Sequence, residues 1–238
     1  MSGFTTIRAG STELELHPFP AAFWRPGRDL FVADLHLGKD AAFRASAIPV
    51  PCGPANKTLD RLATAIGRLR PERVWILGDL VHSVRSFTDP IREGFERFLS
   101  DHPTVDFSLV LGNHDRGIRD RLQGLRVDVL DPPHRRGEFL LVHDATAAVA
   151  SAVPYGIGHH GDGPLVIGGH VHPAVTIAVG GEREKLPCFH QRGDRLTLPA
   201  MGAFTGTHRI EPQTDDEVHV VAEDSVIRIS ATRQRSRR

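Results

Sequence analysis

The stretch Phe107-Ser-Leu-Val-Leu-Gly-Asn-His-Asp115 joins a short apolar run directly to a glycine and three polar side chains. Runs of this length, rich in Leu, Val and Phe and closed by Gly or Asp, are typical of buried strands. In layered α/β folds, the loops after the carboxyl ends of the strands form the functional site. The stretch therefore predicts a buried strand, Phe107–Leu111, that leads into functional groups.

Four other apolar runs end in the same way, with histidine or carboxylate side chains after them. They are Leu30–Ala33 before Asp34 and His36, Val74–Leu77 before Asp79, Phe139–Val142 before His143, and Leu165–Ile167 before His170 and His172. Because the strand ends of a layered fold meet at one edge, we expect these segments to converge. Each motif alone is weak, since Gly-Asp usually marks a turn, and the conjunction of all five carries the prediction.

Helical patterns lie between the first of these runs. Asn56–Leu69 repeats apolar residues at helical spacing. Pro90–Leu99 does the same, with Asp89 as its expected N-cap before the proline. Arg116–Leu122 is expected to form a short helix. The alternation of strands and helices predicts an α/β layered fold.

From Ala174 onward the pattern changes to short strands and turns. We expect hairpin turns at Gly180-Gly181 and Glu223-Asp224. The strands expected to form a second sheet are Val175–Val179, Glu184–Phe189, Arg195–Leu198, Val218–Ala222 and Val226–Ile229. We expect residues 1–230 to form a single domain, and the basic residues 231–238 to be a frayed, disordered tail. Contact with nucleic acid is the alternative interpretation of the tail.

The composition is that of an ordinary globular protein. Of 238 residues, 40% are hydrophobic and 24% charged, and the 29 basic residues balance the 29 acidic ones. A balanced chain lacks the broad positive field with which proteins hold long duplex DNA, although a local basic groove is not excluded. Cys52 and Cys188 are too few for a disulfide framework and are expected to be reduced. No signal peptide or membrane-spanning run is evident, so we expect a cytoplasmic protein with no membrane partner.

Polar side chains at the five strand ends form a candidate metal-ligand set. Carboxylate, imidazole and amide groups without thiolates suit Mn²⁺, Fe²⁺ or Zn²⁺, of which we expect Mn²⁺. The supply exceeds what one ion needs and suits two divalent ions about 3.5–4 Å apart with one shared carboxylate. The candidate ligands are Asp34, His36, Asp79, Asn113, His143, His170 and His172.

The order of these motifs resembles the calcineurin-like metallophosphoesterase superfamily, whose pattern is D-x-H, G-D-x-x, G-N-H-D/E, H and G-H-x-H. The resemblance implies a four-layer α/β/β/α sandwich with two facing mixed sheets. It implies that Asp34, His36, Asp79 and His172 hold one metal, with Asp79 bridging to a second metal held by Asn113, His143 and His170. It also implies that His114 is a catalytic histidine and that Asp115 orients it.

A narrower resemblance covers roughly residues 33–206. Several motifs resemble those of the bacterial DNA ligase-associated metallophosphoesterases, also called PdeM, namely DLHLGK, GDLVHS, GGHVHP, KLPCF and PAMGAFTG. These proteins are described as DNA damage response endonucleases. Two residues depart from the expected patterns. His82 stands where many superfamily members have an acidic residue or arginine, and His190 follows LPCF where an aromatic residue is expected. These departures concern substrate details and leave the metal ligands intact.

The mechanism that we expect is in-line attack on phosphorus by a water activated between two divalent ions. His114 would donate a proton or a hydrogen bond to the leaving oxygen, and Asp115 would fix the tautomer of His114. Candidate substrate contacts are His82, Lys39 and Arg44, because basic groups close to a phosphate are useful. The alternative for Lys39 and Arg44 is a solvated charge, and the alternative for His82 is a side chain that does not face the site.

The leading hypothesis is a two-metal phosphodiesterase that acts on nucleic acid, DNA or RNA, or on a nucleotide. The narrower resemblance implies an endonuclease associated with DNA repair, with a DNA ligase and a helicase as functional neighbours. Substrate choice depends on the loops around a site, so a small-molecule phosphatase or a nucleotide-sugar pyrophosphatase remains the enzymatic alternative. The alternative from another class is a catalytically inactive scaffold that binds partner proteins, against which the intact ligand set argues.

Overall fold

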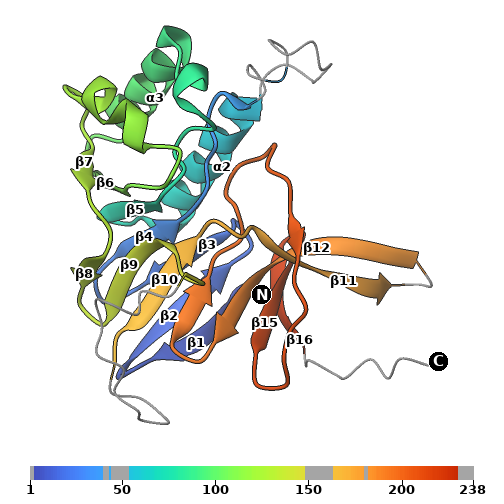
Figure 1. The fold of residues 1–238 in the computed structure, drawn as a ribbon. Helices are drawn as coiled ribbons and strands as arrows, with labels where there is room; N and C mark the ends of the chain where they lie inside the picture. Colours follow the sequence, from blue (N-terminus) through green and yellow to red (C-terminus); the bar gives the residue numbers. More distant parts are fainter. Residues whose placement is uncertain (1–2, 40–42, 44–53, 148–162, 180–181, 230–238) are drawn as a thin grey trace.

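Two mixed β-sheets face each other in the computed structural model, which describes residues 3–39, 43, 54–147, 163–179 and 182–229 (Figure 1). The strands of the first sheet lie in chain order; β1 to β4 are antiparallel and β4 to β7 parallel. These strands are β1 (Thr5–Ala9), β2 (Thr12–His17), β3 (Ala21–Trp24), β4 (Asp29–Val32), β5 (Arg73–Leu77), β6 (Asp106–Val110) and β7 (Asp128–Leu130).

The second sheet has the order β14-β11-β12-β13-β10-β9-β8, and β15 joins it on β12 and carries β16. Parallel pairs join β9 to β10 and β10 to β13, whereas β8–β9, β11–β12 and β12–β13 are antiparallel. The strands are β8 (His134–Arg136), β9 (Phe139–Asp144), β10 (Leu165–Gly169), β11 (Pro173–Val179), β12 (Glu182–Arg192), β13 (Arg195–Thr197), β14 (His208–Arg209), β15 (Glu217–Ala222) and β16 (Ser225–Ile229).

Two helices, α2 (Pro54–Leu69) and α3 (Asp89–Asp101), cover the outer face of the first sheet (Figure 1). Short 3-10 helices follow β5 and β6, namely η1 (Val84–Ser86) and η2 (Arg116–Leu122). The N-cap of α3 is Thr88, and Asp89 is the first helical residue, so the expected cap at Asp89 is wrong by one position. Within the described ranges, both α-helices flank the first sheet and none lies against the second.

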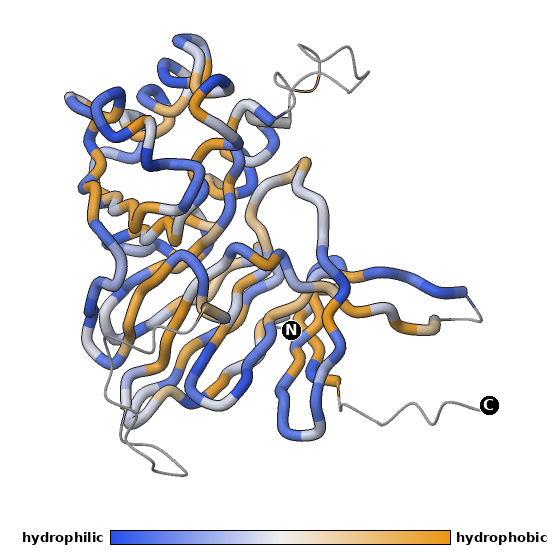
Figure 2. Tube along the Cα trace, viewed as in Figure 1, coloured by the Kyte–Doolittle hydropathy of each residue, from blue (hydrophilic) through white to orange (hydrophobic). Residues whose placement is uncertain are grey.

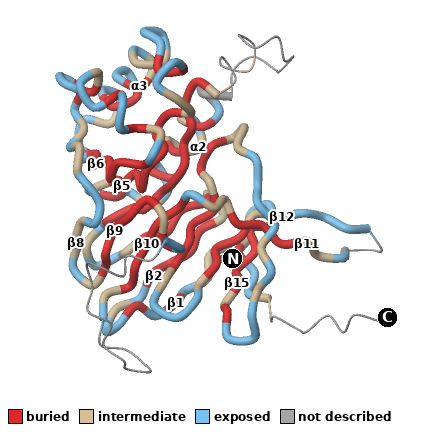
Figure 3. The backbone as a smooth tube through the Cα atoms, viewed as in Figure 1, coloured by how far each residue is buried: buried red, intermediate tan, exposed pale blue. Residues whose placement is uncertain are grey.

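Alternation along the buried strands divides their side chains between two cores. On β5, Val74 and Ile76 pack with the helices, while Trp75 and Leu77 pack against the second sheet. Figure 3 shows β5, β6, β9 and β10 as mostly buried. Because successive side chains of a strand point to opposite faces, a strand buried on both faces needs apolar residues throughout. The continuous apolar runs therefore reflect a sheet held between helices and a second sheet.

The structure confirms two facing mixed sheets with flanking helices. It also differs from the expected organisation in two places. The three N-terminal strands β1 to β3 were not predicted, and β9 and β10 belong to the second sheet, which therefore begins well before Ala174. Register is set by long-range pairing, so sheet membership could not follow from local apolar runs.

The expected hairpins have antiparallel strands on both sides of the turn. Val179 pairs with Glu182, while Gly180 and Gly181 lie outside the described residues. Ala222 pairs with Ser225, so that Glu223 and Asp224 form the turn, as expected.

The tail at 231–238 and Cys52 also lie outside the described residues. No helix in the described part of the chain is long and apolar enough to cross a membrane.

Candidate metal centre

The predicted strand ends converge at one place between the two sheets. The loops after β4 and β5 are joined by backbone hydrogen bonds, because the Asp34 N–H donates to the Gly78 carbonyl at 3.1 Å and the His36 N–H to the Asp79 carbonyl at 2.9 Å. The second sheet reaches the same place, because the His170 N–H at the end of β10 donates to Asp34 Oδ2 at 2.8 Å. Segments far apart in the sequence are thus fixed to one another by backbone contacts.

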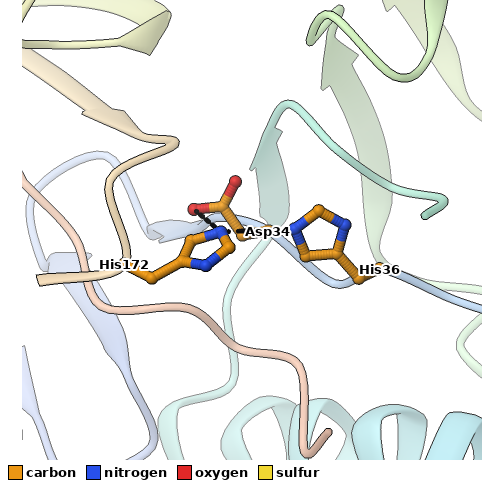
Figure 4. A group of neighbouring side chains, drawn as sticks. All are labelled: Asp34, His36 and His172. Atoms are coloured by element: carbon orange, nitrogen blue, oxygen red, sulfur yellow. Dashed lines mark hydrogen bonds and ion pairs between the residues drawn. The ribbon is translucent and has the colours of Figure 1, made fainter. Parts of the chain in front are cut away.

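The first candidate ligand group consists of Asp34, His36 and His172 (Figure 4). His36 Nε2 lies 3.2 Å from His172 Nε2, and His172 Nε2 lies 3.6 Å from Asp34 Oδ2. Asp34 and His36 are buried, and His172 is partly exposed. The ligand atoms of the three side chains all lie within 4.8 Å of one another.

The second candidate group consists of Asp79, His143 and His170, with Asn113 beside it. His143 Nε2 lies 3.5 Å from Asp79 Oδ1, 3.0 Å from His170 Nδ1 and 2.8 Å from Asn113 Oδ1. Asp79 joins the two groups, because its Oδ1 faces His143 while its Oδ2 lies 3.9 Å from His36 Nε2 in the first group. The sequence-predicted set of seven ligands is therefore brought together around one carboxylate.

The donor atoms in both groups are spaced as the ligands of one ion are spaced. Nitrogen ligands about 2.1 Å from an ion lie roughly 3.0–3.4 Å apart in octahedral or tetrahedral geometry. The two closest nitrogen pairs, at 3.2 Å and 3.0 Å, match this spacing. Asp34 Oδ1 is also buried without a hydrogen-bond partner, which is costly for a carboxylate unless a cation compensates it. The residues present therefore fit divalent metal ions.

Backbone carbonyls leave Nε2 of two imidazoles available for a metal. Nδ1 of His143 lies 3.2 Å from the Leu77 carbonyl, and Nδ1 of His172 lies 3.1 Å from the Gly206 carbonyl. A carbonyl can only accept, so in the neutral form of each ring Nδ1 carries the proton and Nε2 has the lone pair that a metal would use. Burial, followed by the neighbouring His172 and Lys39, lowers the pKa of His36 to about 2, which keeps this imidazole neutral as well.

The loops that carry the ligands hold strained backbone. Five of the candidate ligands have φ angles in the left-handed region, which residues other than glycine adopt at a cost of roughly 1–3 kcal/mol each. Such strain persists only where the surrounding structure imposes it, and it concentrates at functional sites. The residues are Asp34 (55°), His36 (47°), Asp79 (49°), His170 (73°) and His172 (52°).

Glycines beside the ligands leave the space that neighbouring ligands occupy. A Cβ at Gly78 would lie 2.1 Å from His143 Nδ1, one at Gly112 would lie 2.4 Å from Asp79 Oδ1, and one at Gly169 would lie 2.3 Å from Asp34 Oδ2. No Cβ approaches another atom so closely in folded proteins. The glycines that precede Asp79, Asn113 and His170 are therefore each required by a ligand candidate from a different strand.

Asp115 has contacts other than the expected one. Its Oδ2 accepts the Gly112 N–H at 3.0 Å and its Oδ1 accepts the Val81 N–H at 3.3 Å. Burial raises the pKa of Asp115 to about 6, while these backbone hydrogen bonds oppose the shift. The carboxyl group thus ties the loop after β6 to the loop after β5, and no hydrogen bond joins it to the described side chain of His114. The expected orienting contact with His114 is replaced by a backbone contact.

His114 lies at the open side of the centre. Its side chain is 38% exposed, and its Nε2 lies 3.8 Å from Asp79 Oδ2. Its backbone N–H donates to Asp79 Oδ1 at 3.1 Å, which fixes the start of the loop that carries it. An imidazole that reaches both the shared carboxylate and solvent can contact a substrate bound at the centre.

Two of the three candidate substrate contacts lie beside the first ligand group. The ring of His82 is 5.7 Å from that of His36 and 5.9 Å from that of His114. Lys39 lies close enough to lower the pKa of both His36 and His82, although burial is the larger cause for each. Arg44 lies outside the described residues. His190 has a different partner, because its Nε2 lies 2.8 Å from Asp216 Oδ2.

The role of the segment 199–206 was not predicted from chemistry. Its Met201 and Gly202 N–H groups donate to the carbonyls of Ala33 and Asp34, and its Gly206 carbonyl orients His172. The signal in the sequence was the motif PAMGAFTG, which contributed to the family resemblance but did not indicate what the segment does at the site.

The family model for calcineurin-like phosphoesterases matches residues 28–171, which is more than half of the chain and contains six of the seven candidate ligands. The chain therefore belongs to the calcineurin-like phosphoesterase family, and it is a metal-dependent hydrolase. The superfamily resemblance noted in the sequence is confirmed. No curated protein sequence matches this chain.

The solved structures that resemble the chain include a nuclease and a phosphoesterase. The nuclease MPE of Pseudomonas putida is 29% identical, covers 95% of this chain over 100% of its own length, and has a TM-score of 0.73. YfcE, a phosphoesterase from E. coli, is 14% identical, with 86% of this chain and 99% of its own length covered and a TM-score of 0.42.

Proposed function

We propose that this protein is a two-metal phosphodiesterase that cleaves nucleic acid, as a nuclease. The observation that carries the proposal is the pair of ligand groups that share Asp79. Its support in the comparisons is the likeness to a protein described as a nuclease, over nearly the whole chain.

In this proposal, Asp34, His36 and His172 hold one ion together with Asp79, and Asn113, His143 and His170 complete the coordination of the other with Asp79. Mn²⁺ is the ion that we propose, and Fe²⁺ or Zn²⁺ also suit this donor set. When bound, two divalent ions supply an activated water and neutralise charge on the phosphoryl oxygens.

His114 is the residue that we propose as the proton donor to the leaving oxygen. The support for this role is the partial exposure of the imidazole and its distance of 3.8 Å to the shared carboxylate, because a proton donor has to reach both the centre and a substrate that enters from solvent. Asp115 positions His114 indirectly, by holding the backbone of the loop that carries it. His82 and Lys39 are proposed contacts for phosphoryl oxygens, because both lie beside His36.

The His114→Ala variant tests this assignment. We expect the variant to keep the metal content of the wild type while cleavage of a single-stranded oligonucleotide, whose alkoxide leaving group needs a proton, falls by roughly 10²–10⁴-fold, the range for loss of a general acid. Metal content is measured by plasma mass spectrometry after dialysis. The matched control is Asp79→Asn, which should lose metal and activity together. Equal loss of metal in both variants would show that His114 is a ligand.

A comparison of substrates separates the proposed nuclease from its alternative. The metal-loaded protein is tested on bis(p-nitrophenyl) phosphate, p-nitrophenyl phosphate, RNA, and single- and double-stranded DNA. Cleavage of diesters and of internal nucleic-acid bonds supports the nuclease. Hydrolysis of the monoester alone supports a small-molecule phosphatase, and no turnover with Mn²⁺, Fe²⁺ or Zn²⁺ supports the inactive scaffold.

The biological setting proposed for this activity is DNA repair in the cytoplasm, in functional association with a DNA ligase and a helicase. Its support is the resemblance of words such as GDLVHS and GGHVHP to the ligase-associated phosphoesterases. We also propose that residues 1–230 act as a single domain.

A further inference from the structure

Strands β11 and β12 form a two-stranded arm that extends from the body of the protein (Figure 1). The pairing of β11 with β14 ends at Ala174, and the pairing of β12 with β15 begins at Cys188. In the part of the chain that the structure describes, residues 175–179 and 182–186 therefore pair only with each other, and Pro187 pairs with Ala174. We call residues 173–179 and 182–187 the arm. It begins at the metal centre, because Pro173 directly follows His172.

Cross-strand pairing determines which side chains share a face of the arm, because directly opposed residues point to the same side and successive residues alternate. The register pairs Thr176 with Lys185 and Ala178 with Arg183, and Ala174 pairs with Arg209 of the neighbouring β14. These six residues and Pro187, which pairs with Ala174, form one face, which we call the basic face. The opposite face carries Val175, Ile177, Leu186, Glu184 and Glu182.

The charges of the arm are thus separated between its two faces. Arg183, Lys185 and Arg209 are exposed on the basic face, whose other members are two alanines, a threonine and a proline. Lys185 Nζ donates to the Thr207 carbonyl at 2.6 Å, next to Gly206, whose carbonyl orients His172. Among the described residues, none of the three cations forms an ion pair with a carboxylate. Figure 2 shows the outer part of β12 as hydrophilic, and Figure 3 shows it as exposed.

The three cations stand at regular steps from the metal centre. Their partners on β11 are two, four and six residues beyond His172, and a strand rises about 3.4 Å per residue. Arg209, Lys185 and Arg183 are therefore opposite points about 7, 14 and 20 Å along the arm. A polyanion with regularly spaced charges matches such a row, whereas a single small phosphate ester is too short to span it.

We propose that the basic face of the arm is a docking surface for the phosphate backbone of a nucleic-acid strand that leads into the metal centre. The inference rests on the proposed function and adds to it a surface outside the metal site. Each cation would displace counterions from a backbone phosphate, which contributes affinity that depends on salt and not on sequence. The balanced charge of the whole chain does not oppose this, because Glu182 and Glu184 lie on the other face.

The test is the double variant Arg183→Gln/Arg209→Gln, which leaves the Lys185 hydrogen bond to Thr207 in place. The matched control is Arg8→Gln/Arg97→Gln, which removes two exposed arginines outside the arm. For metal-loaded protein, we measure KM for a single-stranded 20-mer as a function of salt, and kcat/KM for bis(p-nitrophenyl) phosphate. Circular dichroism and Tm establish that both variants are folded.

We expect the arm variant to raise KM for the 20-mer about 10- to 30-fold at 0.1 M salt, because two lost phosphate contacts lower the salt slope by about 1.4. Turnover of bis(p-nitrophenyl) phosphate should stay unchanged, and the control should behave like the wild type. Equal KM and salt slope in the arm variant and the control would overturn the docking surface while leaving the proposed function intact. Failure of the wild type to hydrolyse either diester overturns the proposed function. In that event an anisotropy titration of the labelled 20-mer still decides whether the arm binds it.

Discussion

Replacing Gly169 by alanine should break the first ligand group through a steric effect alone. The new Cβ would lie 2.3 Å from Asp34 Oδ2 and 2.5 Å from the Cβ of Ala33. An ordinary contact needs about 1 Å more, whereas metal–ligand distances tolerate only about 0.2 Å. The Asp34 carboxylate must therefore turn away, and its 2.8 Å hydrogen bond from the His170 N–H is lost with it.

We expect Gly169→Ala to weaken the tighter Mn²⁺ binding step by about 100-fold or more, and overpacking to lower the free energy of unfolding by about 1–3 kcal/mol. Isothermal titration calorimetry with Mn²⁺ and urea unfolding of the metal-free protein measure the two effects separately. The matched control is Gly94→Ala in α3, where a new Cβ meets nothing within 4 Å. This control should gain up to about 1 kcal/mol of stability and bind Mn²⁺ normally. Two ions bound by Gly169→Ala with wild-type affinity would refute the inferred role of Asp34.

Two further predictions concern groups outside the metal centre. Burial alone would raise the pKa of Asp216, but hydrogen bonds from Arg192, a backbone N–H and an imidazole outweigh it and hold the pKa well below its ordinary value. The stability that Asp216 contributes is therefore fully present above about pH 4 and is lost as the pH falls further. Asp216→Asn should lower Tm at pH 7, and the Tm difference from the wild type should be smaller near pH 2. A Tm difference that does not change with pH would contradict this. Burial raises the pKa of Cys188 to about 12. In a Cys52→Ser background, the protein should therefore react with a thiol reagent at pH 8 only after urea unfolds it. Rapid reaction of the folded protein would show that the thiol is accessible.

The pattern of apolar and polar residues along the chain predicted the positions of most residues of the candidate site. The apolar run before Asp34 and the run before Asp79 identify adjacent buried strands, and a strand end can direct a polar side chain to only one edge of a sheet. The helix at Asn56–Leu69 followed from spacing of the same local kind, and the structure extends it to Pro54. These features depend on residues that are neighbours in the chain, so the sequence contains them directly.

Contacts between distant segments were decided only in three dimensions. The contact of Asp115 with Val81 could not be predicted, because Val81 comes from another loop whose approach depends on the pairing of β5 with β6. The same holds for the orientation of His172 by the Gly206 carbonyl. Backbone carbonyls carry no signal in the sequence, and every residue has one.

The sequence by itself thus determined which residues could bind metal and that they stand at strand ends. The tertiary structure alone decided that Gly169 must lack a side chain and that Arg183 and Lys185 share a face of the arm with Arg209, and it supplied the distances by which Asp79 joins the two groups. The physical reason is that ligand chemistry belongs to single side chains, whereas distances and faces arise from the register of strands that are far apart in the chain.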